Sequence, residues 1–251
     1  VVEAKAPMVR KDLTSSQASI DATEIESLPV ESISQVLTLQ AGVVQGAGGE
    51  IHIRGGRSTE IAYTVNGVSI SNPFNNSRSV NIATNAVKEL SVISGTFNAE
   101  YGNALSGIVN TVTKEGGRKY KGTVSFYTGD YISDRTDVFM NIDDLDPVNT
   151  TTTEMTFGGP IPFLENKFSF FLSGRWNESK GYLYGIRQHT IYDSVYKNPS
   201  DPNDIRISST GDGEVVSMNP STSISATAKL TYKPLAGLKI NYYAIYSQGE
   251  A

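Results

Sequence analysis

Few side chains in this sequence are spaced in a way that supports catalysis. His189 is followed by Asp193 and Ser194, the residue types of a hydrolase triad, but the serine lies outside any nucleophile-elbow motif. The chain has no cysteine, only two histidines, His52 and His189, and no methionine cluster, which argues against direct ligation of a transition metal. We therefore expect no catalytic residue, no metal site and no cofactor, and we predict that the protein is not an enzyme.

Three other segments invite a ligand-binding interpretation. Residues 46–49 are rich in glycine, as phosphate-binding loops are, but no Gly-Lys-Ser/Thr follows them. The acidic run at residues 143–146 offers oxygen ligands for Ca²⁺, yet its spacing fits no known calcium loop, so a solvated loop is favoured. Four tyrosines in a later segment either stack on a ligand or pack within their loop, alternatives that the sequence leaves open: Tyr182, Tyr184, Tyr192 and Tyr196.

Composition narrows the classes of partner. The 251 residues include 21 Lys and Arg against 26 Asp and Glu, a net charge of 21 minus 26, or -5, without a long block of either sign. A nucleic-acid-binding domain needs a clustered basic face, so no nucleic-acid partner is expected. No stretch approaches the roughly 20 consecutive apolar residues of a membrane-spanning helix, so any membrane is crossed by strands. The first residues lack the features of a signal peptide, and we expect the sequence to begin within a mature protein or after processing.

Mixed helix and strand signals occupy residues 1–117. Ser32 and Gln35 fit a capping box for a helix over residues 32–41, and Gly42 is placed to end it. Asn66-Gly67 between two apolar runs predicts a tight hairpin. A further helix or turn is expected at residues 81–86, and strands are expected at residues 50–54, 61–65, 68–70, 87–93 and 107–112. These signals predict a small α/β domain.

The remaining residues, 118–251, read as long strands with alternating connections. Strands are expected at residues 122–129, 152–159, 168–176, 223–232 and 238–246. The connections between them are long, short, long and short in turn. Outer-membrane barrels have short turns on the periplasmic side and longer loops outside, which is the same alternation.

Side-chain alternation along these strands agrees with a membrane barrel. From residue 224 to 232 every second residue is apolar or aromatic, whereas the intervening residues, among them Lys229, are polar. Phe171, Tyr243 and Ile245 interrupt this pattern on their strands. Five strands cannot close a barrel, and an open edge in lipid leaves backbone groups unpaired at a cost of several kcal/mol each, so we expect further strands to follow. The predicted fold class is an α/β domain followed by antiparallel transmembrane β-barrel strands that form an incomplete barrel.

Four blocks in the first domain carry a family resemblance. They are residues 53–57 (Ile-Arg-Gly-Gly-Arg), 63–68 (Tyr-Thr-Val-Asn-Gly-Val), 92–95 (Val-Ile-Ser-Gly) and 99–110 (Ala-Glu-Tyr-Gly-Asn-Ala-Leu-Ser-Gly-Ile-Val-Asn). In this order they resemble the plug signature of TonB-dependent outer-membrane receptors. The turn at residues 158–163 is similar to that of the branch with an N-terminal carboxypeptidase-regulatory-like domain. One departure is Asn66, where the family usually has Asp.

The resemblance implies roles for particular residues. Substrate is expected at two apical loops of the plug, residues 45–49 and 71–78, through Gln45, Asn72, Phe74, Asn75, Asn76 and Arg78. The structural signature of the plug corresponds to Arg54, Gly55, Arg57, Asn66, Gly67, Gly95, Glu100, Tyr101, Gly102 and Gly107. Val1, Val2, Glu3 and Ala4 are interpreted as the remnant of a TonB box. For Arg54 and Arg57, pairing with carboxylates of the barrel wall is favoured over binding an anionic substrate.

The function implied is energised import across the outer membrane of a Gram-negative bacterium. The expected partners are the TonB energy-transducing complex, outer-membrane lipid, and a small-molecule, chelate, glycan or peptide substrate, with partner proteins at the surface as a further class. A 22-strand barrel is implied. The alternative is an outer-membrane scaffold that binds or exports peptides or proteins. A third interpretation, without a membrane, is a soluble β-rich interaction protein.

Overall fold

The computed structural model describes residues 15–28, 30, 32–95, 102, 104–162, 164, 167–198, 200–201, 203–235 and 237–250. The chain divides into two compact units. The first comprises Val1–Val124, Glu154–Gly174 and Ser225–Ser247, and the second comprises Ser125–Thr153, Arg175–Ile224 and Gln248–Ala251. Within the described ranges, no helix combines the length and apolar character needed to span a membrane.

The N-terminal domain of the first unit is built on a five-stranded mixed sheet. Its strand order is β1-β6-β7-β4-β5, with β4 and β7 parallel and the other neighbours antiparallel. The strands are β1 (Ser15–Asp21), β4 (Ile61–Val65), β5 (Val68–Ser69), β6 (Val87–Gly95) and β7 (Gly107–Thr113). The inner strands are largely apolar and buried, as expected for strands covered by neighbours. The α/β domain predicted from the sequence is therefore confirmed.

Two short helices complete the core of this domain. They are α1 (Ala22–Ser27) and α2 (Ile33–Thr38). The predicted capping box of α2 is present, because Ser32 Oγ accepts from the Gln35 amide and Gln35 Oε1 accepts from the Ser32 amide. Gly42 follows with φ of +80°, a conformation that glycine adopts without strain. The apolar face of α2 is buried, with Val36 and Leu37 fully inaccessible.

Shorter elements lie between the main strands. They are the hairpin of β2 (Val43–Gln45) and β3 (Ile51–Ile53), and the single-turn helices η1 (Ser58–Glu60) and η2 (Thr84–Ala86). The predicted hairpin at Asn66-Gly67 is confirmed, because β4 and β5 pair across it and both turn residues have positive φ, +50° and +85°. Sequence analysis missed β1 and α1, in which Ile20 and Ile25 are the buried hydrophobic residues.

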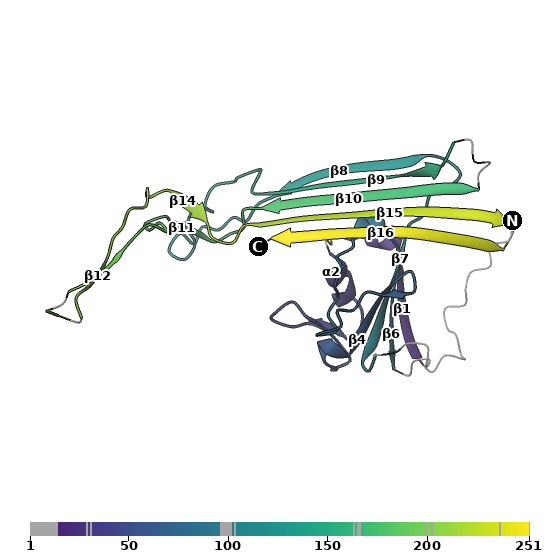
Figure 1. The fold of residues 1–251 in the computed structure, drawn as a ribbon, viewed down its shortest axis with the longest axis horizontal. Helices are drawn as coiled ribbons and strands as arrows, with labels where there is room; N and C mark the ends of the chain where they lie inside the picture. Colours follow the sequence, from purple (N-terminus) through teal and green to yellow (C-terminus); the bar gives the residue numbers. More distant parts are fainter. Residues whose placement is uncertain are drawn as a thin grey trace. The chain divides into compact units, whose positions relative to one another are not determined.

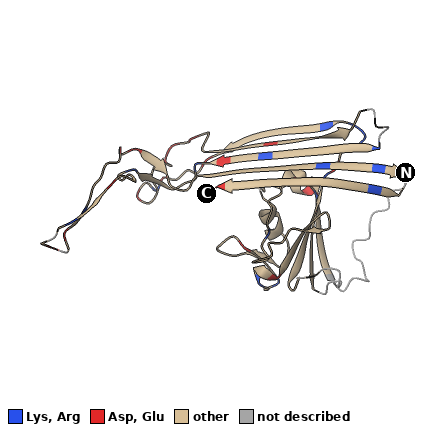
Figure 2. Cartoon of the chain, in the orientation of Figure 1, with Lys and Arg blue, Asp and Glu red and all other residues tan. Residues whose placement is uncertain are grey.

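The second half of the chain forms an antiparallel sheet with the order β16-β15-β10-β9-β8 (Figure 1). Its strands are β8 (Lys121–Gly129), β9 (Thr150–Pro160), β10 (Phe168–Ser179), β15 (Ser221–Leu235) and β16 (Leu238–Glu250). All five correspond to predicted strands, and charged residues are sparse along them (Figure 2). Over the described residues β8 and β16 are the two edges, so the sheet is not closed into a barrel.

On β15 the polar face is buried and the apolar face is exposed, which is the reverse of the arrangement in a water-soluble protein. Thr227, Lys229 and Thr231 are buried, whereas Ile224 is 44% exposed and Leu230 is 37% exposed. Atoms of the N-terminal domain cover the polar face, because Lys229 Nζ lies 3.4 Å from the carbonyl oxygen of Thr113. The apolar face is the one left open.

The residues that interrupt the alternation are contacts with the N-terminal domain. Phe171 is 6% exposed and belongs to the same hydrophobic cluster as the core of that domain. Ile245 packs against this cluster, and the Tyr243 hydroxyl donates to the Val65 carbonyl at 3.3 Å. Phe171 and Ile245 therefore interrupt the polar face where it packs against the hydrophobic core of the N-terminal domain.

The second unit contains the two long connections. The connection after β10, expected to be a loop, carries two short hairpins, which pair β11 (Tyr184–Ile186) with β14 (Val215–Ser217) and β12 (Val195–Lys197) with β13 (Ile205–Ile207). We call residues 180–220, which hold these hairpins, the arm. The acidic run of the other connection is fixed at one end, because Asp146 pairs with Lys180 at 2.6 Å.

Candidate functional site

The glycines of the signature blocks have different structural roles in the N-terminal domain, the predicted plug. Gly55, Gly67 and Gly95 have positive φ, where a β-carbon is strained. Gly107 has another role: a β-carbon there would lie 2.5 Å from Cδ1 of Ile53, so only glycine lets β7 pass β3. Gly102 differs, because a β-carbon there would meet nothing within 4 Å.

The second predicted apical loop, residues 71–78, is ordered by its own asparagines. The loop is closed by a bridge between Ser71 and Arg78. Asn72 Oδ1 accepts from the Phe74 amide at 2.9 Å, and Asn75 Oδ1 accepts from the Ser77 amide at 3.1 Å, which are typical side-chain turns. Phe74 itself is 96% exposed at the tip.

Asn76 fixes this loop to the sheet. Its Nδ2 donates to the carbonyl oxygens of Thr59 at 2.8 Å and Ile61 at 3.2 Å, and its own φ is +55°. Asparagine tolerates this left-handed conformation better than most residues. The amide side chain thus holds the loop above the start of β4.

The first predicted apical loop is a tight turn between β2 and β3. Gln45 Nε2 donates to the Gly49 carbonyl at 3.1 Å, and the Gly46 amide donates to the Glu50 carbonyl at 2.8 Å. The Glu50 carboxylate lies against Gly46 and Gly48 and is 3.6 Å from His52 Nε2. Its own backbone amide lowers the pKa of Glu50 first of all, and His52 contributes in the same direction. The carboxylate is thus directed at the turn.

Both apical loops line one small pocket of about 180 Å³. Gly49 comes from the first loop and Glu50 directly follows it, whereas Asn75, Ser77 and Arg78 come from the second loop. Burial lowers the pKa of Arg78, and burial raises the pKa of the adjacent Tyr63. A larger hollow of about 1020 Å³ shares Asn75 with this pocket. Phe74 and Asn76 line the larger hollow.

The remaining predicted residues fall into two groups. Arg54 is exposed with φ of +50°, and the Arg57 amide donates to Glu60 Oε2 at 3.1 Å. In the part of the chain that the structure describes, neither arginine forms an ion pair with a carboxylate, so their pairing with wall residues stays a prediction. The TonB-box remnant at residues 1–4 and the signature residues at positions 100 and 101 lie outside the described residues.

An ionic cluster that was not predicted from the sequence lies between the N-terminal domain and the antiparallel sheet of β8, β9, β10, β15 and β16, which we call the wall strands. Glu115 Oε1 contacts Lys229 Nζ at 3.2 Å and Lys239 Nζ at 2.6 Å. The Lys229 side chain is only 2% exposed and also lies 3.4 Å from Thr113 Oγ1. Burial raises the pKa of Glu115, but hydrogen bonds and charge from the two lysines outweigh this and leave the pKa below its usual value. The signal available in the sequence was a lysine on the polar face of a wall strand.

The chain also passes close to the wall just after Glu115. A β-carbon on Gly116 would collide with the backbone of Phe170 in β10. Asn85 Nδ2 donates to the Gly174 carbonyl of the same strand at 3.3 Å. The connection into the wall strands is thus held by close backbone contact as well as by charge.

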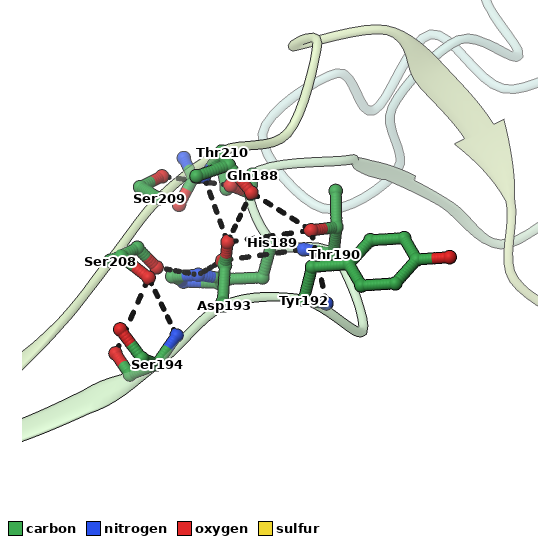
Figure 3. A network of polar contacts seen from close by, with 9 residues as sticks. All are labelled: Gln188, His189, Thr190, Tyr192, Asp193, Ser194, Ser208, Ser209 and Thr210. Carbon is green, nitrogen blue, oxygen red and sulfur yellow. Dashed lines mark hydrogen bonds and ion pairs between the residues drawn. The ribbon is translucent and has the colours of Figure 1, made fainter.

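His189 and Asp193 meet in the arm, but they do not form a triad with Ser194. His189 Nδ1 lies 2.9 Å from Asp193 Oδ2, and the Asp193 carboxylate also accepts from the amide and hydroxyl of Thr210 (Figure 3). The Ser194 amide donates to Ser208 Oγ at 2.7 Å. The network connects the two sides of the arm by hydrogen bonds, so its role is structural.

The four tyrosines do not share one surface role. Tyr182 packs against Tyr131 and Phe139, with ring centroids 5.4 and 6.4 Å apart. Tyr192 is 87% exposed and points away from the polar network (Figure 3). Tyr182 is therefore accounted for by loop packing, whereas a ligand-stacking role for Tyr192 stays a prediction.

Comparison with known proteins agrees with this fold. Residues 9–108 match the model of the TonB-dependent Receptor Plug Domain. Over 74 residues, 30% of this chain and 7% of the relative, the chain is 28% identical to the TonB-dependent transporter Oar of Myxococcus xanthus. It superposes on the siderophore receptor PirA of Pseudomonas aeruginosa with a TM-score of 0.59 at 18% identity, over 98% of this chain and 36% of that one.

A second solved structure gives the same picture. The outer membrane transporter YddB of Escherichia coli is similar with a TM-score of 0.61 at 14% identity, over 92% of this chain and 32% of that one. The chain therefore spans about a third of the length of the solved receptors that it matches.

The described residues combine a globular domain with an antiparallel sheet whose polar face that domain covers. Residues 9–108 are similar to the plug domain of TonB-dependent receptors, and the fold is a plug domain followed by antiparallel strands, as in the solved receptors. The family consists of transporters and receptors rather than enzymes.

Proposed function

We propose that this protein is an outer-membrane receptor of a Gram-negative bacterium that binds a substrate at the extracellular face and imports it with energy transmitted by TonB. The observation that carries the proposal is the inverted pair of faces on β15, where Lys229 is buried against the plug and Leu230 is exposed. A strand with this arrangement suits lipid on one side and a plug on the other. The proposal divides the chain into a plug over residues 1–117 and wall strands over residues 118–251.

The proposed substrate site is the apical side of the plug, where the pocket and the larger hollow meet at Asn75. Polar groups of the ordered loops and the exposed ring of Phe74 suit a ligand held by a few converging contacts. TonB is proposed to engage Val1, Val2, Glu3 and Ala4. We propose no catalytic residue, because the one constellation resembling a triad is a fastening of the arm.

A capture experiment tests the proposal on the intact protein. The purified C-terminal domain of TonB is expected to retain the detergent-solubilised protein, and to lose it when residues 1–4 are deleted together with the residues upstream. Deletion of the arm tip, residues 195–207, serves as the matched control and should leave capture unchanged. Equal capture of the two deletion variants, or recovery of the protein in the soluble fraction without detergent, counts against the proposal.

The arm supports a second candidate function, a scaffold that binds or exports peptides or proteins. It exposes large apolar side chains: Ile191 and Tyr192 lie before its tip, and Val195, Tyr196, Ile205 and Ile207 lie within it. Such side chains are suited to contact with a polypeptide. Capture of a defined polypeptide that depends on residues 195–207, together with absence of TonB binding, favours this function over import.

A further inference from the structure

Arg78 is partly buried in the plug, and no carboxylate of the described residues forms an ion pair with it. Its Nη2 donates to Asn81 Oδ1 at 2.9 Å and lies 3.5 Å from Ser34 Oγ. Burial acts against its charged form. A guanidinium carries five N–H donors, so most of its capacity is unused by these two contacts. Burying a cation in this way is unfavourable unless a partner compensates it.

The pocket beside Arg78 is shaped for one small polar group. It has a volume of about 180 Å³ and is lined by the hydroxyl-bearing residues Ser34, Ser58, Tyr63 and Ser77. A water molecule occupies roughly 30 Å³ of liquid, so the pocket has room for several waters or one head group. Pockets for whole ligands are larger, roughly 300 to 1,000 Å³.

One carboxylate lines this pocket, and it is already engaged. Glu50 lies against Gly46 and Gly48, so closely that a β-carbon on Gly48 would be 2.6 Å from its Oε2. Its other oxygen, Oε1, faces His52 Nε2 at 3.6 Å. The carboxylate therefore belongs to the β2–β3 turn and does not neutralise Arg78.

We propose that the pocket binds one anionic oxygen group of the substrate, such as a carboxylate or phosphate, on the Arg78 guanidinium. Arginine presents a planar fork that matches both groups, and the surrounding hydroxyls can donate to the remaining oxygens. The bulk of the substrate lies over the larger hollow, which shares Asn75 with the pocket. This inference rests on the proposed function, because it names the chemical class of the substrate.

The first test measures binding of simple anions to the intact protein in detergent. At constant ionic strength, ligand-observed NMR should detect binding of inorganic phosphate, of acetate, or of both, and no binding of neutral glycerol. The anion that binds more tightly shows whether the pocket prefers a phosphate or a carboxylate group. Arg78→Gln should weaken binding at least about tenfold, because a charge-assisted contact is lost. Arg135→Gln, which removes the same charge from an exposed ion pair of the second unit, should not.

The second test avoids any variant. Butanedione modifies accessible arginines, and mass spectrometry of the wild-type protein reads out Arg78 directly. Phosphate or acetate should slow modification of Arg78 several-fold and leave Arg135 unchanged. Wild-type protein that binds neither anion, or equal modification of Arg78 with and without them, overturns the inference.

The two proposals fail separately. Neither anion test requires TonB, so absent anion binding with retained TonB capture removes the anionic substrate group alone. Anion binding without TonB capture removes the importer and leaves the pocket assignment standing.

Discussion

At the scale of single residues, Gly107 is explained by close packing that a side chain would disturb. Gly107→Ala places a methyl group 2.5 Å from Ile53 Cδ1 in the core of the plug. Overpacking of this kind costs about 1 to 3 kcal/mol. We expect faster hydrogen exchange across β7 and a lower melting temperature of the plug transition in the intact protein.

Gly102→Ala is the matched control for that substitution. It lies in the same signature block, is exposed, and has open space around its α-carbon. Its melting temperature should stay within error of the wild type. Equal effects of both alanines contradict the steric explanation.

The stability of the polar network around His189 and Asp193 in the arm is expected to depend on pH. The Thr210 hydroxyl is the largest cause that lowers the pKa of Asp193 to about 2, and Asp193 in turn raises the pKa of His189 above 6.5. The Asp193 contribution is therefore complete above its unfolded pKa of 3.8 and lost as the pH falls through about 2. The His189 contribution is complete below pH 6.5 and lost as the pH rises through its raised pKa.

NMR titration of His189 checks this prediction. The imidazole should titrate above 6.5 in the wild type and return toward 6.5 in Asp193→Asn. Limited proteolysis should cut that variant faster within the arm at pH 7. A His189 pKa that does not respond to Asp193→Asn contradicts the contact drawn in Figure 3.

At the scale of elements, the wall strands were the most predictable part of the molecule. Their alternation has a period of two over many residues, and connection lengths add independent information. The capping box at Ser32 and the Asn66-Gly67 hairpin are local signals and were equally readable. β1 was missed because its sequence, SSQASID, shows no apolar alternation and Ile20 is its buried hydrophobic residue.

Contacts between distant elements were not readable from the sequence. Phe171, Tyr243 and Ile245 break the alternation of polar and apolar residues when each strand is considered alone. Their partners lie in the plug, which for Tyr243 means 178 residues away at Val65, so no local window contains the explanation. The pocket shared by the two apical loops is non-local in the same way: both loops were predicted, but not that Glu50 and Arg78 line one cavity.

Neighbouring residues on β10 allow the plug contact to be tested. Phe171 is 6% exposed and packs in the plug core, whereas Leu172 is 47% exposed on the opposite face. Phe171→Ala should destabilise the plug by about 3 to 5 kcal/mol, the usual cost of truncating a buried phenylalanine. Hydrogen exchange should rise in α2 and β4. Leu172→Ala should leave plug exchange unchanged, and a reversed order contradicts the assignment of the two faces.

At the scale of the whole molecule, ion pairs connect the plug to the wall strands. The contribution of an ion pair to stability depends on its burial more than on its length. The pair of Glu115 and Lys239 is 2.6 Å long and the pair of Glu26 and Lys114 is 2.7 Å long. However, Glu115 also holds Lys229, whose side chain is 2% exposed, whereas the Glu26 side chain is 62% exposed. Removing one partner of a buried pair costs about 3 to 5 kcal/mol, and an exposed pair is worth about 0 to 1 kcal/mol.

Glu115→Gln should therefore loosen the attachment of the plug to the wall far more than Glu26→Gln. Urea titration of the intact protein, followed by hydrogen exchange at residues 107–113, should show release of this segment at a lower urea concentration in Glu115→Gln alone. Acid should act similarly on the wild type: the Glu115 contribution is complete above its ordinary pKa of 4.5 and is lost as the pH falls through its lowered value. Equal urea midpoints for the two variants, or release that does not depend on pH, would mean that Lys229 is stabilised by Thr113 and by packing rather than by Glu115, and that the plug is held by its apolar contacts alone.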